Sequence, residues 1–395
     1  MKLAATLLVS CVASLLALGM VMLYSASMVE SGPKYLIMQL LFFGAGLVAC
    51  ASAALLDYRT LKKFVWPLLG VSVVLLLLVL EPHIGRKVNG ARRWFSFGPV
   101  RFQPSELAKL ALILAVAWYG EHYQRRMQTW KRGIMIPGAF IALVLGLIFI
   151  EPDRGTTILL ASVTGAMLLI SGVRWRYILP PVITAIGGLG LSLWHDPMRA
   201  KRIFGWLYLE ENRSGVGYQA YQAMLALGAG GWAGRGLGNS RQALGFVPEH
   251  HTDFILCIIG EELGVIATLS IVLGFLAIVV CGIYIALRAP DTFGMLLGSG
   301  ISLLIGLQAL INIGVVTSAL PNKGLPLPFI SYGGSSLMFM LICIGLLLSI
   351  ARRAIDFPLT IETRAAQAAA EGISEDKSRL PTREAGLLKA KGGLI

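Results

Sequence analysis

Residues 264–287 read GVIATLSIVLGFLAIVVCGIYIAL, a run without one charged side chain. A helix of about 20 such residues is long enough to cross the hydrocarbon core of a bilayer. The whole chain has this character: 56% of its 395 residues are hydrophobic, 14% are charged, and the mean hydropathy is +0.73. Soluble domains carry about 25% charged residues. The composition therefore predicts a multi-pass membrane protein and excludes a disordered or nucleic-acid-binding chain.

Similar apolar runs recur along the chain and predict an all-α fold with about ten membrane-spanning helices. The first run has no small-residue cleavage site, so we expect a retained anchor and not a removed signal peptide. We expect one transmembrane domain over residues 1–355 and a flexible cytoplasmic tail over residues 356–395. The predicted spans lie near residues 4–24, 35–56, 64–81, 105–120, 134–150, 155–172, 177–194, 264–287, 294–317 and 335–351.

The distribution of Lys and Arg gives the orientation, because cytoplasmic loops of membrane proteins are enriched in both. If there are ten spans, one face holds the cations of alternate gaps and of both chain ends, so we expect both termini to be cytoplasmic. The opposite, outer face then has three long connections: residues 82–104, 195–263 and 318–334. The cytoplasmic cations are Lys2, Arg59, Lys62, Lys63, Arg125, Arg126, Lys131, Arg132, Arg174, Arg176, Arg288, Arg352 and Arg353.

Two outer connections are rich in cations where this rule predicts few. The connection 82–104 includes Arg92 and Arg93, which indicates either an anionic partner at the outer surface or side chains that snorkel to lipid headgroups. The longer connection includes Arg213 and a glycine-rich stretch, residues 228–240. This stretch could offer backbone N–H groups to phosphate or sugar oxygens, or be a flexible loop.

Ionisable residues inside spans are costly and usually functional. Glu106 and Lys109 stand three residues apart in the fourth span, on one helix face, and can pair. They form either a polar wall of a substrate cavity or a structural ion pair between helices. Asp153, in the next outer turn (EPDRGTT, residues 151–157), suits a helix N-cap at least as well as catalysis.

Residues 246–264, FVPEHHTDFILCIIGEELG, place an acidic cluster at the outer mouth of an apolar helix. Asp253 could cap that helix, or act as a general base because partial burial raises a carboxyl pKa. The neighbouring His250 and His251 do not point toward one ion in a helix or a strand. Five scattered cysteines indicate neither a disulfide framework nor a zinc site.

The last outer connection, residues 321–337, reads PNKGLPLPFISYGGSSL. Three prolines make it rigid, and a rigid loop at membrane depth is tolerated where it is buried or lines a cavity. Lys323 and Ser335 are candidate substrate ligands within it. Together the outer cations, the glycines and the acidic cluster suggest a lipid-linked anionic substrate. An enzyme and a flippase would share these features, and no motif indicates ATP use.

At this point several motifs resemble the SEDS family (shape, elongation, division and sporulation), and the similarity runs from about residue 10 to residue 353. The stretches LYSAS (23–27) and GNSRQALGFVPEHHTDF (238–254) favour the division branch over the elongation branch. The resemblance implies a ten-helix glycosyltransferase that polymerises lipid II. The segments that match are GARRWFSFGPVRFQPSELAKLALI (90–113), EPDRGTT (151–157), GYQAYQAMLALGAGGWAGRGLGNS (217–240), VPEHHTDFILCIIGEELG (247–264) and PNKGLPLPFISYGGSSL (321–337).

The resemblance also implies roles for single residues and partners. Asp253 matches the family's essential acid, and Glu106 and Lys109 match its polar membrane pair. The implied partners are lipid II, the undecaprenyl-pyrophosphate-linked glycan, a class B penicillin-binding protein and other septal membrane proteins, in the cytoplasmic (inner) membrane. Arg154 departs from the family, which often has an uncharged residue there, so the neighbouring acids have a possible local partner.

The expected chemistry is attack of a sugar hydroxyl on a lipid pyrophosphate-linked glycan, with Asp253 as general base. A divalent cation, Mg²⁺ or Mn²⁺, is an alternative that would make Asp253 a metal ligand. Two other functions stay open: a lipid II flippase, and a non-catalytic scaffold of the division complex. The cations expected to hold pyrophosphate are Arg92, Arg93, Arg213 and Lys323.

Overall fold

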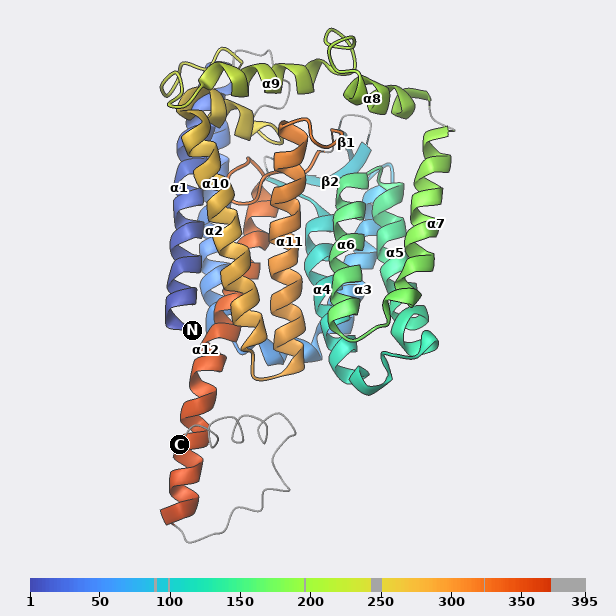
Figure 1. Ribbon diagram of the computed structural model, residues 1–395, viewed down its shortest axis with the longest axis vertical. Helices are drawn as coiled ribbons and strands as arrows, with labels where there is room; N and C mark the ends of the chain where they lie inside the picture. Colours follow the sequence, from blue (N-terminus) through green and yellow to red (C-terminus); the bar gives the residue numbers. More distant parts are fainter. Residues whose placement is uncertain (89–90, 99, 195–196, 243–250, 323, 371–395) are drawn as a thin grey trace.

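The computed structural model describes residues 1–88, 91–98, 100–194, 197–242, 251–322 and 324–370. Its long helices lie side by side in one bundle (Figure 1). Six helical segments within the described residues are long and apolar enough to cross a membrane, and α3 and α6 are shorter apolar helices. The bundle consists of α1 (Lys2–Ser31), α2 (Lys34–Leu55), α3 (Val65–Leu80), α4 (Pro104–His122), α5 (Ile136–Ile150), α6 (Arg154–Ile170), α7 (Trp175–Trp194), α10 (Ile255–Leu287), α11 (Thr292–Val316) and α12 (Gly334–Ala370).

These segments are helical because a bilayer core offers no water to backbone N–H and C=O groups, and a helix satisfies them within one segment. The predicted all-α membrane fold is confirmed, while the count of ten spans stays a prediction. The N-terminus and the far end of α12 lie on the same side of the bundle (Figure 1), as the charge distribution predicts for two cytoplasmic ends.

Ion pairs join several helices on that side. Lys62, in the short helix η1 (Tyr58–Lys63), lies 2.7 Å from Glu121 at the end of α4 and 3.3 Å from Asp291 before α11. Arg353 of α12 lies 2.9 Å from Asp57. Cations that mark this face as cytoplasmic in the sequence therefore also hold the helix ends together.

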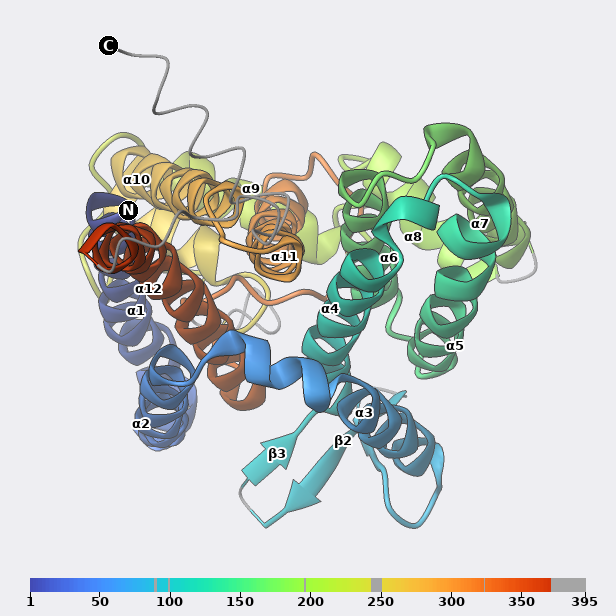
Figure 2. The same cartoon turned by 90° about the horizontal axis from the view of Figure 1, so that it is seen from below.

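The opposite face has a small antiparallel sheet, β1 (Arg86–Val88), β2 (Ala91–Phe97) and β3 (Val100–Phe102), which the sequence analysis treated only as a connection. Residues of β2 alternate between two faces, so Phe95 is buried while Arg92 is half-buried. The sheet contacts α3 and α4 through β2 and α12 through β3 (Figure 2). Two further helices, α8 (Pro197–Leu207) and α9 (Tyr218–Gly230), lie across the same end (Figure 1).

The glycine-rich stretch 228–240 packs against a kink in α10. Gly264 has φ +79 inside that helix, and a Cβ there would lie 2.4 Å from the carbonyl oxygen of Trp232. The N–H groups of Arg235 and Gly236 donate to the carbonyls of Glu261 and Glu262. These N–H groups therefore brace α10, so the described contacts give this stretch a structural role.

Helix α12 extends well beyond the predicted end of the last span at residue 351 and reaches Ala370. Ala, Arg, Gln and Glu are strong helix formers, and the segment 362–370 consists largely of them. The first part of the predicted flexible tail is thus helical, and residues 371–395 lie outside the described part.

Candidate active site

Asp253 stands two residues before the start of α10, at the end of the bundle that is predicted to face outward. Its carboxylate packs against Gly324, where an added Cβ would lie 2.9 Å from Asp253 Oδ2. Its backbone carbonyl accepts a 2.7 Å hydrogen bond from Asn312 Nδ2 of α11. Asp253 is not the N-cap suggested by the sequence: Phe254 occupies that position and makes no side-chain cap bond. The Asp253 carboxylate lies beside Gly324, one residue before this position.

Two amides of α11 hold the loop that contains Gly324, residues 321–333, called here the pre-α12 loop. Asn312 Nδ2 also donates to the carbonyl of Leu325 at 2.8 Å, and Gln308 Nε2 donates to the carbonyl of Pro326 at 2.9 Å. The sequence analysis missed both amides. Their spacing of four residues in an apolar span puts them on one helix face and was the available signal.

Glu106 and Lys109 form the ion pair expected from their spacing, with Lys109 Nζ 2.7 Å from Glu106 Oε2 and side chains only 4% and 2% exposed. Lys109 Nζ also donates to Gln308 Oε1 at 3.2 Å. The pair therefore connects α4 to Gln308, which in turn holds the pre-α12 loop. Asn312 lies one helical turn from Gln308 on α11 and binds the backbone of Asp253. Direct contact with a substrate stays a prediction.

An aromatic cluster braces the other side of this segment. The rings of Tyr35 and His251 stack with centroids 4.6 Å apart, and Tyr332 packs edge-on against Tyr35. Gln39 of α2 donates to the carbonyl of Ser331 and accepts from the N–H of Gly333. His251 is thus held two residues from Asp253, while the acidic and imidazole groups of residues 249 and 250 lie outside the described part of the chain.

The two arginines predicted as substrate ligands in the connection 82–104 lie in β2 and differ in their contacts. Arg93 Nε donates to the carbonyl of Glu151 at 2.9 Å, and Arg93 Nη2 donates to that of Pro152 at 2.6 Å, so this guanidinium ties β2 to the turn before α6. Arg92 stands opposite Lys87 across the strands. Like charges at directly opposed positions are destabilising, and an anion bound at this sheet face would relieve the repulsion.

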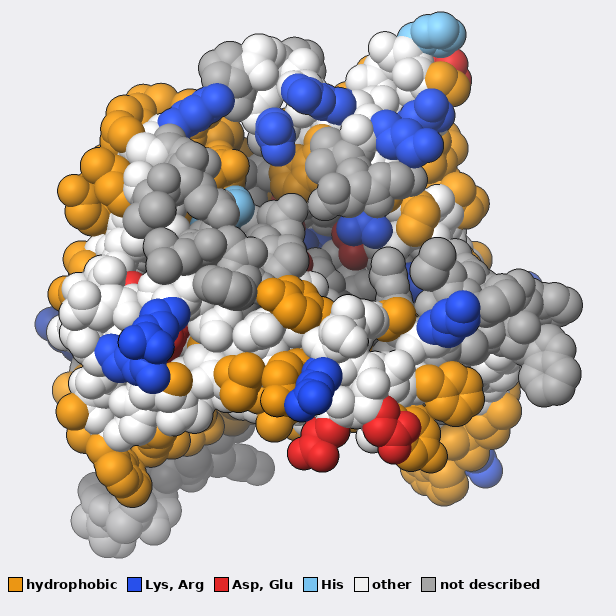
Figure 3. Space-filling view, turned by 90° about the horizontal axis from the view of Figure 1, so that it is seen from above, with side chains coloured by type: hydrophobic (Ala, Val, Ile, Leu, Met, Phe, Trp, Pro, Cys, Tyr) orange, Lys and Arg blue, Asp and Glu red, His pale blue; other side chains and the backbone are white. Residues whose placement is uncertain are grey.

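The remaining predicted ligands are spread over the outer face. Arg213 is exposed between α8 and α9. Ser335 is 1% exposed at the start of α12, and Lys323 lies outside the described residues. Seen from this side, the molecule is hollowed near its middle, and basic and acidic side chains are visible inside the hollow (Figure 3).

The turn between α5 and α6 contains a second pair of acids. Asp153 caps α6 as the sequence suggested, accepting a hydrogen bond from the N–H of Thr156. Glu151 is fully buried, and neither of its carboxylate oxygens has a hydrogen-bond partner among the described residues. Burial, and then the charge of Asp153, raise the pKa of Glu151 to about 8, although Arg93 opposes the shift.

This pKa predicts a pH-dependent stability. The pKa of Glu151 in the folded state lies above the ordinary value of 4.5, so the folded state binds this proton more tightly than the unfolded state does. The stability that Glu151 contributes in its protonated form is fully present below pH 4.5 and is lost as pH rises through about 8. The free energy of unfolding should fall by up to about 1.4 kcal/mol per pH unit across this window. Thermal unfolding in detergent from pH 5 to 9 measures it, and Glu151→Gln should flatten the curve. The exposed Glu81→Gln serves as control, and an unchanged slope in Glu151→Gln contradicts the assignment.

Comparison with known proteins gives matches along almost the whole chain. A family model described as "Cell cycle protein", whose name combines FtsW, RodA and SpoVE, matches residues 5–355. A protein of Trichlorobacter lovleyi is 41% identical over 355 residues, covering 88% of this chain and 93% of its own length. A protein of Coxiella burnetii is 39% identical, covering 87% of this chain and 95% of its own length. Both are named "Probable peptidoglycan glycosyltransferase FtsW".

Solved structures agree with the sequence relatives. A chain from the structure described as "Structural coordination of polymerization and crosslinking by a peptidoglycan synthase complex" has a TM-score of 0.76 and 31% identity, covering 88% of this chain and 97% of that one. Thermus thermophilus RodA, the rod shape determining protein, has a TM-score of 0.66 and 31% identity. The match covers 87% of this chain and 95% of that one. These matches confirm the family resemblance seen in the sequence.

Proposed function

The chain belongs to the FtsW, RodA and SpoVE family of cell cycle proteins, and from this premise we propose that it is a peptidoglycan glycosyltransferase. It polymerises lipid II into glycan strands at the outer face of the cytoplasmic membrane. The names of its relatives support septal wall synthesis over elongation. The observation that supports this activity most directly is the carboxylate of Asp253, fixed against Gly324 at the outer end of the bundle.

In the proposed reaction, the 4-hydroxyl of the acceptor's N-acetylglucosamine attacks the anomeric carbon of the lipid-linked glycan. The new glycosidic bond forms while the bond from the anomeric carbon to the diphosphate oxygen breaks. The lipid diphosphate leaves with the electron pair, and the hydroxyl proton passes to Asp253. Because general-base catalysis supplies about 10²–10⁴-fold, positioning by the pre-α12 loop and charge neutralisation must supply the rest.

Neutralisation of the diphosphate is the proposed role of the outer cations. Arg92, whose neighbour across the strands is also a cation, is the strongest of these candidates. Arg93, Arg213, Lys323 and Ser335 remain proposed ligands. No three His, Cys, Asp or Glu side chains gather among the described residues. Mg²⁺ is often held by one or two carboxylates together with substrate phosphates. Asp253 and the diphosphate would therefore suffice for Mg²⁺ or Mn²⁺, which would supply positive charge to the leaving group.

A partner transpeptidase is the second part of the proposal. One of the similar solved structures is a chain of a complex described as joining polymerisation and crosslinking. We therefore infer that this chain works with a class B penicillin-binding protein, and with further septal membrane proteins.

The test uses the purified full chain with lipid II, alone and with its cognate transpeptidase. We expect glycan polymer in at least the second reaction. A flippase would instead move lipid II across liposome membranes and form no polymer, and a scaffold would do neither. Polymer in neither reaction, from protein that is folded and bound to its partner, would overturn the proposed function.

A further inference from the structure

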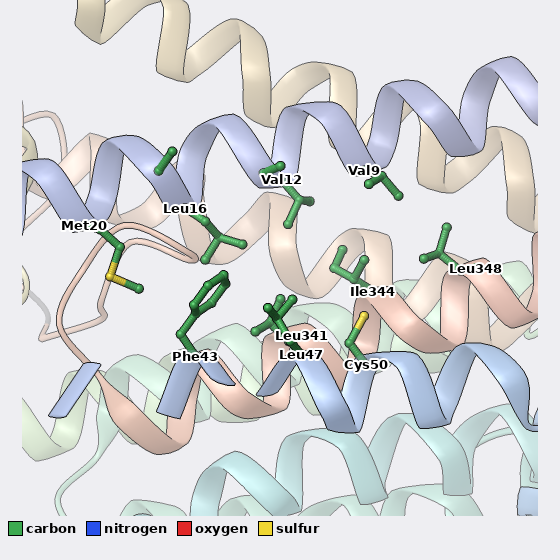
Figure 4. Close-up of a pocket in the computed structure, with 12 residues that line it drawn as sticks. Val9, Val12, Leu16, Met20, Phe43, Leu47, Cys50, Leu341, Ile344 and Leu348 are labelled. Carbon is green, nitrogen blue, oxygen red and sulfur yellow. The ribbon is translucent and has the colours of Figure 1, made fainter. Parts of the chain in front are cut away.

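An apolar groove runs along the outside of the bundle between α1 and α2, with α12 as its floor (Figure 4). Its volume is about 320 Å³. The floor is formed by Leu341 and Ile344, which are each 2% exposed, whereas Val9 and Leu47 at the rims are each 45% exposed. We call it the α1–α2 groove. Its lining also includes Val12, Leu16, Met20 and Phe43.

The position of the groove sets the chemistry of its occupant. All three helices that form it contain segments apolar and long enough to cross a membrane. On α1 the lining residues run from Val9 to Met20, so the groove is about 16 Å long at 1.5 Å per residue. A narrow apolar groove at this depth excludes polar ligands, which would lose their hydrogen bonds there. It fits a hydrocarbon chain that lies parallel to the helices.

One face of α2 leads from the candidate active site to the groove. Tyr35 stacks on His251, and one turn further Gln39 holds the pre-α12 loop. The same face continues into the groove with Phe43 and Leu47, because residues four apart lie above one another on a helix. Next to Met20, at one end of the groove, α1 also packs against the pre-α12 loop, since a Cβ on Gly19 would lie 2.8 Å from Ile330 Cα.

Depth distinguishes between possible hydrocarbon chains. From Lys34, at the outer end of α2, Phe43 and Cys50 lie about 14 and 24 Å further into the membrane. One leaflet provides about 15 Å of the hydrocarbon core. A chain attached to a headgroup at the outer face must therefore be longer than one leaflet to fill the groove. Isoprenoid carriers of wall precursors have such chains.

We propose that the α1–α2 groove binds the distal part of the polyprenyl chain of the lipid-linked substrate, an inference that rests on the proposed function. The diphosphate and sugars would stay at the outer face beside Asp253. The chain would follow α2 inward, past the pre-α12 loop. In this arrangement the groove selects substrates by chain length, whereas the outer residues select them by their sugars and charge.

The first test reports on binding without needing activity. The full chain is placed in phospholipid vesicles with a polyprenyl diphosphate that has a diazirine near the far end of its chain. We expect photolabelled peptides from residues 9–20 and 43–50, and loss of label with excess unlabelled polyprenyl diphosphate. Label that this excess does not displace, or equal label from a diazirine phospholipid, would overturn the proposal, since either result indicates ordinary contact with bilayer lipid.

The second test fills the groove. Ala17→Phe places a ring among the lining residues, and Ser14→Phe adds the same ring to an exposed position of α1 that does not line the groove. We expect Ala17→Phe to raise KM about tenfold for lipid II with a full-length chain, as if about two methylenes lost their contacts. A second substrate is the analogue of lipid II that has a short farnesyl chain in place of the full-length chain. For this analogue the KM of Ala17→Phe should equal that of Ser14→Phe, and the two variants should have the same kcat.

Equal KM changes for both chain lengths, or the same change in Ser14→Phe, would contradict the groove as a chain site. Failure of the proposed function gives a different pattern. In that case the wild-type chain polymerises neither substrate, while the photolabelling experiment still reports whether the groove holds a polyprenyl chain.

Discussion

Asp253→Asn should lower the rate of lipid II polymerisation by at least about 10²-fold, the lower limit for loss of a general base. Asparagine keeps the shape of aspartate and the hydrogen bond from Asn312 to the backbone carbonyl, but it cannot take a proton from the acceptor hydroxyl. The folded structure should survive, so the apparent Tm should stay close to wild type. The assay is polymer formation from lipid II by purified protein with its transpeptidase.

The same variant distinguishes a base from a metal ligand. If Asp253 acts through a divalent cation, the amide oxygen of asparagine remains a weaker ligand, and a high Mn²⁺ concentration should restore much of the rate. If Asp253 is the base, no cation concentration restores it. Glu81→Gln, exposed on the outer side of α3, controls for a general loss of outer negative charge. Polymerisation by Asp253→Asn within about threefold of wild type would remove Asp253 from the reaction altogether.

The membrane fold and its central residues could be predicted from sequence because they depend on local patterns. Apolar runs of sufficient length specify helices in a bilayer, and a spacing of three residues placed Glu106 and Lys109 together. The cap of Asp153 on α6 is equally local. Each of these features depends on residues within a few positions of one another, so no knowledge of the tertiary structure was needed.

The features that were missed depend on contacts between distant segments. Gly324 matters because the carboxylate of Asp253 occupies the space where a Cβ would be, which requires the arrangement of the pre-α12 loop beside α10. The amides of Gln308 and Asn312 become informative only when their carbonyl partners are known. The sheet at 86–102 has two strands of three residues, too short for alternation to identify them.

Removal of one partner of the Glu106–Lys109 pair should have the largest effect on stability. Either Glu106→Gln or Lys109→Met leaves an uncompensated buried charge, which costs about 3–5 kcal/mol. The double variant, Glu106→Gln with Lys109→Met, removes both charges and should recover most of that loss. The wild type, the two single variants and the double variant form a double-mutant cycle. Their stabilities are compared by apparent Tm and by folded yield in detergent.

The chain provides a matched control for this cycle. Lys62 and Glu121 are also 2.7 Å apart, but their side chains are 28% and 27% exposed, at the end of the bundle that is predicted to be cytoplasmic. Partly exposed pairs contribute about 0–1 kcal/mol, so Lys62→Met should cost far less than Lys109→Met. Equal costs at the two sites would show that burial of the Glu106–Lys109 pair is not what matters.

Polymerisation by the double variant then separates the two roles considered for Glu106 and Lys109. If the pair only stabilises the fold, a refolded, stable double variant should polymerise lipid II near the wild-type rate, because Lys109→Met removes the bond to Gln308 but the bond from Gln308 to Pro326 remains. A pair that also contacts substrate predicts wild-type stability with a large loss of rate. Because Lys109 is connected through Gln308 to the loop that positions Asp253, a substrate role should lower kcat more than it raises KM.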